Sequence, residues 1–305
     1  MTAGRLHLPR VLVLLATYQG RPFVDQQIAS ILWQIDVVPR ILLRDDGSAD
    51  DTLAACEAWA TREPASVSIL RDDVRTGSAS GNFFRLLAAA ELGNFDYVAL
   101  ADQDDVWFPD KLARAVAAMR ADGADGYSSD LLAVDEVTRA SWMMDKAGRD
   151  ADLDYLFQGA SAGCTYVLSV AGARLVRDVM ASIDGDWPGG MSHDWTIYAA
   201  CRSRGLRWVR DRRPGLLYRQ HGGNDYGARA GLGGLLQRFR AVRDDWYRNH
   251  VLWLRRVVAM TPAERRVFEA IERGERRWLA SNAFRFRRSR RDARLLALSF
   301  LARLF

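Results

Sequence analysis

An acidic segment after an apolar run holds the first residues that could do chemistry. The run from Tyr97 to Ala101 has the length and composition of a buried strand, and Asp102, Asp104 and Asp105 follow it. The ends of such strands in open α/β sheets point into a ligand crevice, and carboxylate oxygens suit Mg²⁺ or Mn²⁺, which would join them to a phosphate. The segment therefore predicts a metal and diphosphate site. An acidic turn that caps a helix starting near Pro109 is the structural alternative.

A second acidic pair, Asp45 and Asp46, ends the predicted strand 40–44. The next residue, Gly47, permits a tight turn, and the acids at positions 50 and 51 are explained as caps of the following helix. Capping does not account for Asp45 and Asp46. Because the carboxyl ends of parallel strands meet at one edge of a sheet, we expect both to contact the ligand.

Two of the four histidines lie in polar turns later in the chain. His193 and Asp194 open a predicted helix that runs to Arg204, and His221 follows the predicted strand 216–219. Histidine serves as a base, a phosphate donor or a metal ligand, so both turns are candidate parts of a site. A carboxylate in the first turn of a helix is also common as a cap or dipole partner, which is the structural alternative for Asp194.

These candidates require a scaffold that brings strand ends together. The first 120 residues read as a strand followed by a helix, four times over, which is the signature of a parallel, doubly wound α/β sheet. The predicted strands are 11–16, 40–44, 67–70 and 97–101. The glycine-rich loop 77–82 matches neither the Walker pattern nor the dinucleotide fingerprint, so we interpret it as a loop and helix cap.

Beyond residue 120 the pattern is less regular. Strands are predicted at 126–134 and 164–170, and the charged stretch between them, with Trp142, Met143 and Met144, predicts a mobile substrate loop. Further short strands are predicted at 207–209 and 216–219. Gly163 is small enough to bring the backbone close to a ligand, although a plain turn explains it equally well.

The C-terminal part is predicted to be helical. The helical pattern begins at Gly234, and Thr261, Pro262 and Glu264 have the spacing of an N-cap, N1 and N3. We expect a leader at residues 1–9, a catalytic domain at 10–230 and a basic amphipathic helical region at 231–305.

Composition limits the class of protein. The chain has 305 residues, 49% hydrophobic and 27% charged, which excludes a disordered chain. No window approaches the roughly eighteen apolar residues of a membrane span, and the run 11–16 is too short for a signal peptide, so we expect a cytoplasmic protein. The three cysteines are far apart and lack metal-ligand spacing, so we expect reduced, mostly buried thiols.

The last part of the chain is strongly basic. Between residues 285 and 303 there are seven arginines and one acid, Asp292, with Phe284, Phe286 and a leucine-rich end. A basic amphipathic helix on an anionic membrane surface, at the inner face of the cell membrane, explains both the charge and the apolar residues. One alternative is a helix packed on the catalytic domain or on a second subunit of a homo-oligomer. For a nucleic-acid arm the end is too apolar, so nucleic acid is not an expected partner.

Seven motifs in order resemble those of the family 2 glycosyltransferases, which have the GT-A fold, a mostly parallel Rossmann-like sheet flanked by helices. The motifs are ATYQG (16 to 20), RDDGSADDT (44 to 52), GSASGNF (77 to 83), ALADQDDVWFPDKL (99 to 112), GCTYVLS (163 to 169), HDW (193 to 195) and YRQHGGN (218 to 224). The resemblance covers residues 10 to 225. The forms DQDDVW and YRQHGGN look most like the bacterial rhamnosyltransferase branch, whose usual donor is dTDP-L-rhamnose.

The resemblance implies a role for each candidate residue. Asp194 matches the general base, in a variant with His193 where relatives often carry Glu. The implied nucleotide-binding residues are Thr17, Tyr18, Asp45, Asp46 and Asp102. The implied ligands of Mg²⁺ or Mn²⁺ are Asp104, Asp102 and His221. Candidate substrate contacts are Gly163, His193 and Trp107.

The implied activity is that of an inverting, metal-dependent glycosyltransferase. It would move a sugar from a nucleotide-diphosphate donor, dTDP-L-rhamnose or alternatively a UDP-sugar, to a hydroxyl of a cell-surface polysaccharide or lipid-linked saccharide. Asp194 would deprotonate that hydroxyl as it attacks the anomeric carbon. A sugar-phosphate nucleotidyltransferase would need a glycine-rich basic loop after the first strand, which ATYQGRPF does not supply. A binding protein that uses only the arginine-rich tail is the non-enzymatic alternative.

Overall fold

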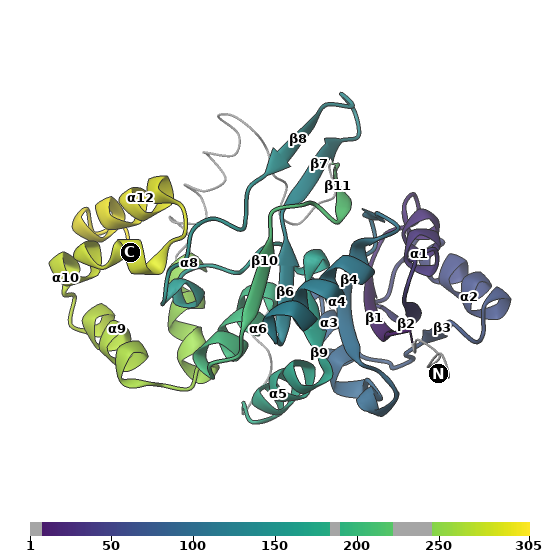
Figure 1. The fold of residues 1–305 in the computed structure, drawn as a ribbon, viewed down its shortest axis with the longest axis horizontal. Helices are drawn as coiled ribbons and strands as arrows, with labels where there is room; N and C mark the ends of the chain where they lie inside the picture. Colours follow the sequence, from purple (N-terminus) through teal and green to yellow (C-terminus); the bar gives the residue numbers. More distant parts are fainter. Residues whose placement is uncertain (1–7, 184–189, 222–245) are drawn as a thin grey trace, which may run out of the picture.

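A mostly parallel sheet forms the centre of the molecule. The structure is a computed structural model that describes residues 8–183, 190–221 and 246–305. The sheet has seven strands in the order β10-β6-β9-β4-β1-β2-β3 (Figure 1). Neighbouring strands are parallel except at β9, which runs antiparallel to both β4 and β6. The strands are β1 (Arg10–Thr17), β2 (Val38–Asp45), β3 (Val67–Ile69), β4 (Tyr97–Asp102), β6 (Gly126–Ser129), β9 (Val167–Ser169) and β10 (Trp208–Asp211).

The central strand β1 is apolar from Val11 to Ala16 because both of its faces are covered. Leu12 and Leu14 pack into one hydrophobic cluster, and Val11, Val13 and Leu15 pack into another on the opposite face. The first cluster includes residues of α3 (Ala79–Ala89), α5 (Val170–Ala181) and α6 (His193–Ser203). The second includes residues of α1 (Val24–Leu32), α2 (Thr52–Arg62) and α4 (Lys111–Asp122). The predicted repetition of strand and helix over the first 120 residues is confirmed, and with it the α/β class.

A second, four-stranded sheet in the order β5-β11-β7-β8 projects beside the first (Figure 1). Its strands are β5 (Val106–Trp107), β7 (Leu131–Asp135), β8 (Ser141–Met144) and β11 (Leu216–Gln220). Strand β5 pairs antiparallel with β11, with Trp107 opposite Leu216. This pairing ties the acidic segment after β4 to the strand that leads into His221.

The predicted strand 126–134 is wrong in one respect, because it is two strands in different sheets. Strand β6 belongs to the central sheet and β7 to the small one, and the chain changes sheet at Asp130. The Asp130 carboxylate accepts hydrogen bonds from the backbone amides of Lys146 at 2.7 Å and Ala147 at 2.8 Å. A buried acid with backbone partners from another segment therefore marks the break.

Two further predictions between residues 135 and 170 need correction. Part of the stretch expected to be a mobile loop, Ser141–Met144, is strand β8, which pairs with β7 as a hairpin partner. Within the predicted strand 164–170, only Val167–Ser169 is extended. The preceding Gly163–Thr165 is a short 3₁₀ turn (η3). Local composition cannot show these differences, since they depend on which strand edge lies nearby.

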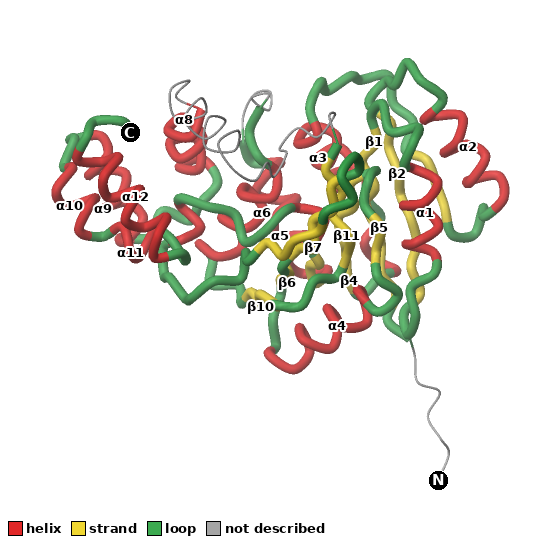
Figure 2. Tube along the Cα trace, turned by 90° about the horizontal axis from the view of Figure 1, so that it is seen from above, coloured by secondary structure: helices red, strands yellow, loops and turns green. Residues whose placement is uncertain are grey.

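The C-terminal helices pack against the catalytic part rather than standing apart from it. They are α8 (Trp246–Trp253), α9 (Pro262–Glu272), α10 (Arg276–Ser281), α11 (Ala283–Phe286) and α12 (Arg290–Leu301), and the short 3₁₀ turn η4 (Leu254–Arg256) follows α8. Earlier in the chain, short 3₁₀ turns lie at η1 (Leu92–Asn94) and η2 (Asp154–Leu156). Figure 2 shows α9 to α12 as a group at one end of the molecule. Phe286 of this group stacks on Phe157 with ring centroids 4.5 Å apart.

Other expectations about this region have mixed outcomes. The helix start at Thr261 is confirmed as a capping box with Pro262 in the first turn and Glu264 at N3. The expected helix beginning at Gly234 lies largely outside the described residues, as do most of the leader and the end of the YRQHGGN motif.

All three cysteines are free and buried, as expected. Of the helices in the described ranges, none combines the length and apolar character needed to cross a bilayer.

Candidate active site

The carboxyl ends of β1, β2 and β4 bring the first group of candidates to one edge of the central sheet. Thr17 lies opposite Asp45, and its neighbour Ala16 lies opposite Asp102. The hydroxyl of Thr17, which is 1% exposed, donates to Asp45 at 3.0 Å. Asp45 also accepts from the amides of Gly47 at 3.0 Å and Ser48 at 2.8 Å. Its carboxylate therefore shapes the turn after β2.

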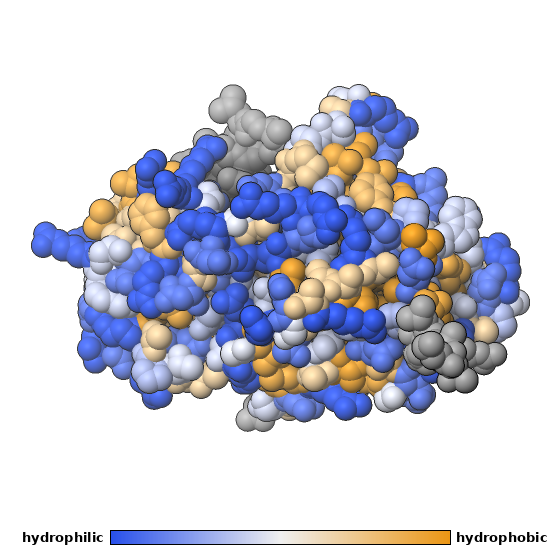
Figure 3. Space-filling model, in the orientation of Figure 1, coloured by the Kyte–Doolittle hydropathy of each residue, from blue (hydrophilic) through white to orange (hydrophobic). Residues whose placement is uncertain are grey.

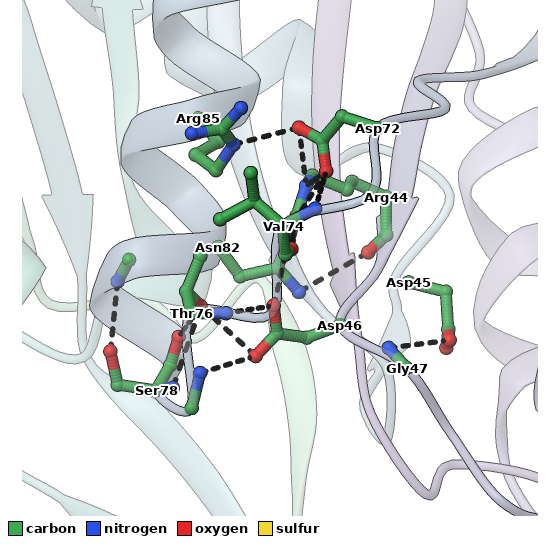
Figure 4. A network of polar contacts seen from close by, with 12 residues as sticks. Arg44, Asp45, Asp46, Gly47, Asp72, Val74, Thr76, Ser78, Asn82 and Arg85 are labelled. Carbon is green, nitrogen blue, oxygen red and sulfur yellow. Dashed lines mark hydrogen bonds and ion pairs between the residues drawn. The ribbon is translucent and has the colours of Figure 1, made fainter.

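The Asp46 carboxylate accepts hydrogen bonds within a buried polar network that centres on Arg44 (Figure 4). The Arg44 guanidinium, 1% exposed, donates to Asp46 at 2.8 Å and to Asp72 at 2.7 Å. Asp46 also accepts from the amides of Thr76 and Gly77, both at 2.8 Å. Burial alone would lower the pKa of Arg44, but the two carboxylates outweigh it and raise that pKa. The partners of Asp46 are thus within the protein, and they hold the loop before α3 against β2.

Gln103 clamps the end of β1 to the acidic segment. Its side-chain amide donates to the carbonyl of Tyr18 at 2.6 Å and accepts from the amide of the same residue at 2.7 Å. A Cβ at Gly20 would lie 2.2 Å from the Gln103 side-chain oxygen, so a larger residue there would displace the Gln103 side chain. The clamp leaves the Tyr18 side chain 55% exposed at the sheet edge, where a base could stack.

His221 meets the acidic segment across 117 positions of sequence. Its Nε2 lies 2.8 Å from Oδ2 of Asp104, and its ring stacks on Phe23 with centroids 4.6 Å apart. Both side chains remain partly open, 20% exposed for His221 and 14% for Asp104. The structure thus brings together two of the three residues expected to bind metal, in a position that solvent can reach.

The third expected ligand, Asp102, lies in an adjoining cluster. Ligand atoms of Asp102, Asp105 and Cys164 lie within 4.8 Å of one another. Asp105 is fully buried, and burial together with the charges of Asp104 and Asp102 raises its pKa. Such mutual repulsion is relieved by a cation. Carboxylates and an imidazole are donors that Mn²⁺ and Mg²⁺ accept, so the residues present fit the expected metal.

Trp107 lies beneath the site instead of lining it. Its indole is 2% exposed and belongs to the hydrophobic cluster around α1 and α4. The ammonium of Lys111 is 3.5 Å from the ring centroid, and burial lowers the pKa of Lys111 to about 7. Trp107 is therefore too buried to be the substrate contact that we expected.

Asp194 lies in the first turn of α6, and its neighbours hold that turn in place. Ser192 is the N-cap: its hydroxyl accepts from the amide of Trp195 and donates to the Asp194 carboxylate. The amide of His193 donates to the hydroxyl of Ser80 at 3.0 Å. A carboxylate at a helix N-terminus is stabilised as an anion, which is the form that accepts a proton.

His193 and Gly163 are in contact. A Cβ at Gly163 would lie 2.4 Å from Nε2 of His193, so the glycine makes room for the imidazole. The ring packs on Phe83 with centroids 4.3 Å apart, and burial lowers the pKa of His193. The neutral imidazole therefore fixes the start of α6 against the η3 turn.

The first turn of α3 connects the two halves of the site. The side chain of Asn82 donates to the carbonyls of Thr17 and Arg44, both at 3.2 Å. Two residues earlier, Ser80 binds the backbone of His193. The start of α3 therefore links the carboxyl ends of β1 and β2 to the helix turn that carries Asp194. The sequence-based interpretation of residues 77–82 as a loop and helix cap did not include this role.

Several positioning residues could not be identified from the sequence. Arg44 reads as the polar end of a strand, yet it organises Asp46. His250 of α8 accepts from the amide of Ser192 at 3.3 Å and stacks on Trp195 at 4.2 Å. Arg288, one of the seven tail arginines, forms a buried ion pair with Asp154. None of the three stands out locally, because Arg44 ends a strand, His250 lies in a helical pattern and Arg288 lies among other arginines.

Comparison with known proteins supports the GT-A fold. Solved structures with similar folds include TarS from S. aureus in complex with UDP-GlcNAc, with a TM-score of 0.57, 14% identity, and coverage of 96% of this chain and 87% of that one. Another is the mannosyltransferase PcManGT from Pyrobaculum calidifontis in complex with GDP-Man and Mn²⁺, with a TM-score of 0.53, 18% identity, and coverage of 98% and 75%.

Sequence comparison identifies the family. The dTDP-rhamnosyl transferase RfbG of Shigella flexneri is 35% identical over 237 residues, which are 78% of this chain and 82% of that relative. Residues 12–177 match the profile of Glycosyl transferase family 2. The chain is therefore a rhamnosyltransferase-like nucleotide-sugar glycosyltransferase that belongs to glycosyl transferase family 2.

Proposed function

We propose that the enzyme transfers L-rhamnose from dTDP-L-rhamnose, with inversion, to a hydroxyl of a cell-surface polysaccharide or a lipid-linked saccharide. The donor part of the proposal is supported by the 35% identity to a dTDP-rhamnosyl transferase over most of both chains. The observation that carries the chemical part is the approach of His221 to Asp104 at the strand edge, because an imidazole and a carboxylate that meet there could together hold the divalent cation that a diphosphate leaving group needs.

The donor would bind along the ends of β1, β2 and β4. The exposed ring of Tyr18 is available for stacking on the base. Asp45 and Asp46 would contribute chiefly by shaping the loops on either side of the base, because their carboxylates already accept hydrogen bonds from this chain. Asp102 would lie near the ribose.

Asp104, Asp102 and His221 would hold Mg²⁺ or Mn²⁺. The bound ion would supply Lewis-acid neutralisation of the charge that develops on the diphosphate. His221 is positioned for this role by its stacking on Phe23. The guanidinium of Arg219 lies 5.1 Å from the centroid of the same ring, and its Nε lies 3.5 Å from the Glu136 carboxylate.

Asp194 would act as the general base. Its carboxylate would take the proton of the acceptor hydroxyl while that oxygen forms a bond to the anomeric carbon of rhamnose. The bond between this carbon and the diphosphate oxygen would break in the same displacement, and dTDP would leave with the bonding pair. Attack from the face opposite the leaving group inverts the anomeric centre without a covalent intermediate.

Donor hydrolysis and nucleotide binding across a panel test this proposal. The panel contains dTDP-rhamnose, UDP-glucose, UDP-galactose and GDP-mannose, each with Mg²⁺, with Mn²⁺ and with EDTA. We expect selective, metal-dependent hydrolysis of dTDP-rhamnose. Selection of a UDP-sugar would overturn the donor assignment, and full activity in EDTA would overturn the metal assignment.

A further inference from the structure

Helix α12 leaves one of its faces in solvent, and that face combines arginine with leucine. Ala293, Leu296 and Phe300 point inward and are 0%, 6% and 2% exposed. On the other side Leu295, Leu298 and Leu301 are 51%, 60% and 52% exposed. At about 100° per residue, these three leucines share one side of the helix with Arg290, Arg291 and Arg294, which are also exposed. We call these six residues the outer face of α12.

The arginines of the tail differ in whether they form ion pairs. Arg285 and Arg288 pair with Asp152 and Asp154 and so fasten the tail to the catalytic part. The arginines of the outer face have no ion pair within residues 8–183, 190–221 and 246–305. The acid of this helix, Asp292, lies on the inner side and is only partly exposed. The outer face is therefore positively charged, and no acid of the described residues forms an ion pair with it.

We infer that the outer face of α12 docks on an anionic phospholipid surface. The arginines would bind lipid phosphates, and the leucines would enter the boundary between head groups and acyl chains. Leu304, just beyond the helix, is also exposed, at 55%. Figure 3 shows apolar and strongly hydrophilic side chains side by side at the upper left, where Figure 1 draws α12.

Two other occupants fit this surface less well. A polyanion such as nucleic acid would use the arginines but leave the exposed leucines in water. A second copy of the chain, joined through the same face, would bring two sets of unneutralised arginines together. An anionic bilayer is the partner that uses both kinds of side chain.

Docking through this face would fix the orientation of the active site relative to the bilayer. On the inner side of α12, Phe300 packs edge-on against Phe157, next to η2, with ring centroids 5.9 Å apart, and Arg288, just before the helix, pairs with Asp154 of η2. The η2 turn contacts α6 through the hydrogen bond of 2.9 Å from Tyr198 to Asp154. The helix that carries Asp194 is therefore joined to the docking surface through buried contacts.

Vesicle sedimentation with the full chain tests the inference independently of catalysis. The probes are vesicles of phosphatidylcholine alone and of an equal mixture with phosphatidylglycerol, at low and high salt. Each surface arginine contributes about five-fold to partitioning onto an anionic membrane, so we expect binding to the mixed vesicles only, weakened by salt. Two double variants, Arg291→Gln with Arg294→Gln and Leu295→Ser with Leu298→Ser, should each lower the partition coefficient by about ten-fold or more.

Matched controls separate this surface from charge in general. The double variant Arg120→Gln with Arg174→Gln removes the same charge from exposed positions on α4 and α5 and should bind vesicles as the wild type does. Circular dichroism and hydrolysis of the soluble donor should be unchanged in the α12 variants. Equal sedimentation of all variants, binding to an oligonucleotide but not to vesicles, or dimerisation that the leucine variant abolishes would each overturn the inference. Vesicle binding by a protein without donor hydrolysis would contradict the proposed function and leave this inference standing.

Discussion

His221 Nε2 and Asp104 Oδ2 lie 2.8 Å apart, although 117 positions separate the two residues in the chain. The contact exists because β5 pairs with β11, so the segment before β5 runs beside the residues after β11. Both side chains stay partly exposed, which distinguishes the pair from the fully buried Asp105 beside it.

We expect His221→Ala to weaken Mn²⁺ binding by at least about 10-fold in the presence of dTDP, because the imidazole is placed to complete the ligand set. Electron paramagnetic resonance of free Mn²⁺ measures this directly. Phe23→Leu is the comparison variant: it keeps the imidazole and removes the ring that positions it, so it should weaken Mn²⁺ binding less than His221→Ala does. Unchanged Mn²⁺ affinity in His221→Ala would contradict a ligand role.

Asp194→Asn should lower kcat by about 100-fold to 10,000-fold while dTDP binding stays at the wild-type level, because the change removes the proton acceptor and little else. Ser192→Ala is the matched variant: loss of the N-cap should cost about 1 kcal/mol of stability and a smaller part of kcat. Single-turnover kinetics and calorimetric nucleotide binding separate the two effects. If Asp194→Asn turned over at the wild-type rate, Asp194 would not be the general base.

Gly163→Ala should reduce turnover because the new methyl group would collide with the His193 imidazole and displace the first turn of α6. Gly93→Ala is the control, since a Cβ there meets nothing within 4 Å. We expect Gly93→Ala to retain full activity and Gly163→Ala to lose activity with nucleotide affinity preserved. Equal kinetics for the two variants would mean that the His193 position does not matter for catalysis.

Arg44→Met should destabilise the fold by about 3 to 5 kcal/mol, because it leaves the buried Asp46 without its ion-pair partner. Urea denaturation measures the loss. Arg71→Gln is the control: its pair with Glu57 is exposed, and its removal should cost no more than about 1 kcal/mol.

The same network predicts how stability depends on pH. Arg44 and Arg85 lower the pKa of Asp72 from 3.8 to about 2. A carboxyl whose pKa is lower in the folded state stabilises the protein above the unfolded pKa, so this contribution should vanish as the pH falls from 3.8 toward 2. In Arg44→Met that acid-dependent loss should be smaller; an identical acid profile would contradict the assigned pairing.

Arg288→Ala should cost about 3 to 5 kcal/mol, because Asp154, fully buried, would lose its cation. Arg290→Ala, two residues away and exposed, should change stability by less than about 0.5 kcal/mol. Denaturant midpoints of the two variants give the comparison. Similar midpoints would mean that the tail is only loosely attached.

The sequence by itself determined the four strands of the first 120 residues, the position of the acids at their ends and the helix cap at Thr261. Buried strands read as apolar runs such as Val11 to Ala16, and caps read as short local patterns such as Thr261 to Glu264, so neighbouring residues carry this information. Because parallel strands end at a common edge, the rough location of Thr17, Asp45 and Asp102 followed as well.

The tertiary structure alone decided which atoms meet. The hydrogen bonds from the loop before α3 to Asp46, the contact of His221 with Asp104, and the burial of Trp107 and Arg288 each depend on elements distant in sequence. A carboxylate beside a strand has the same local pattern whether it faces a ligand or a buried guanidinium. What separates the two cases is the packing of the remaining chain around it, which no local pattern encodes.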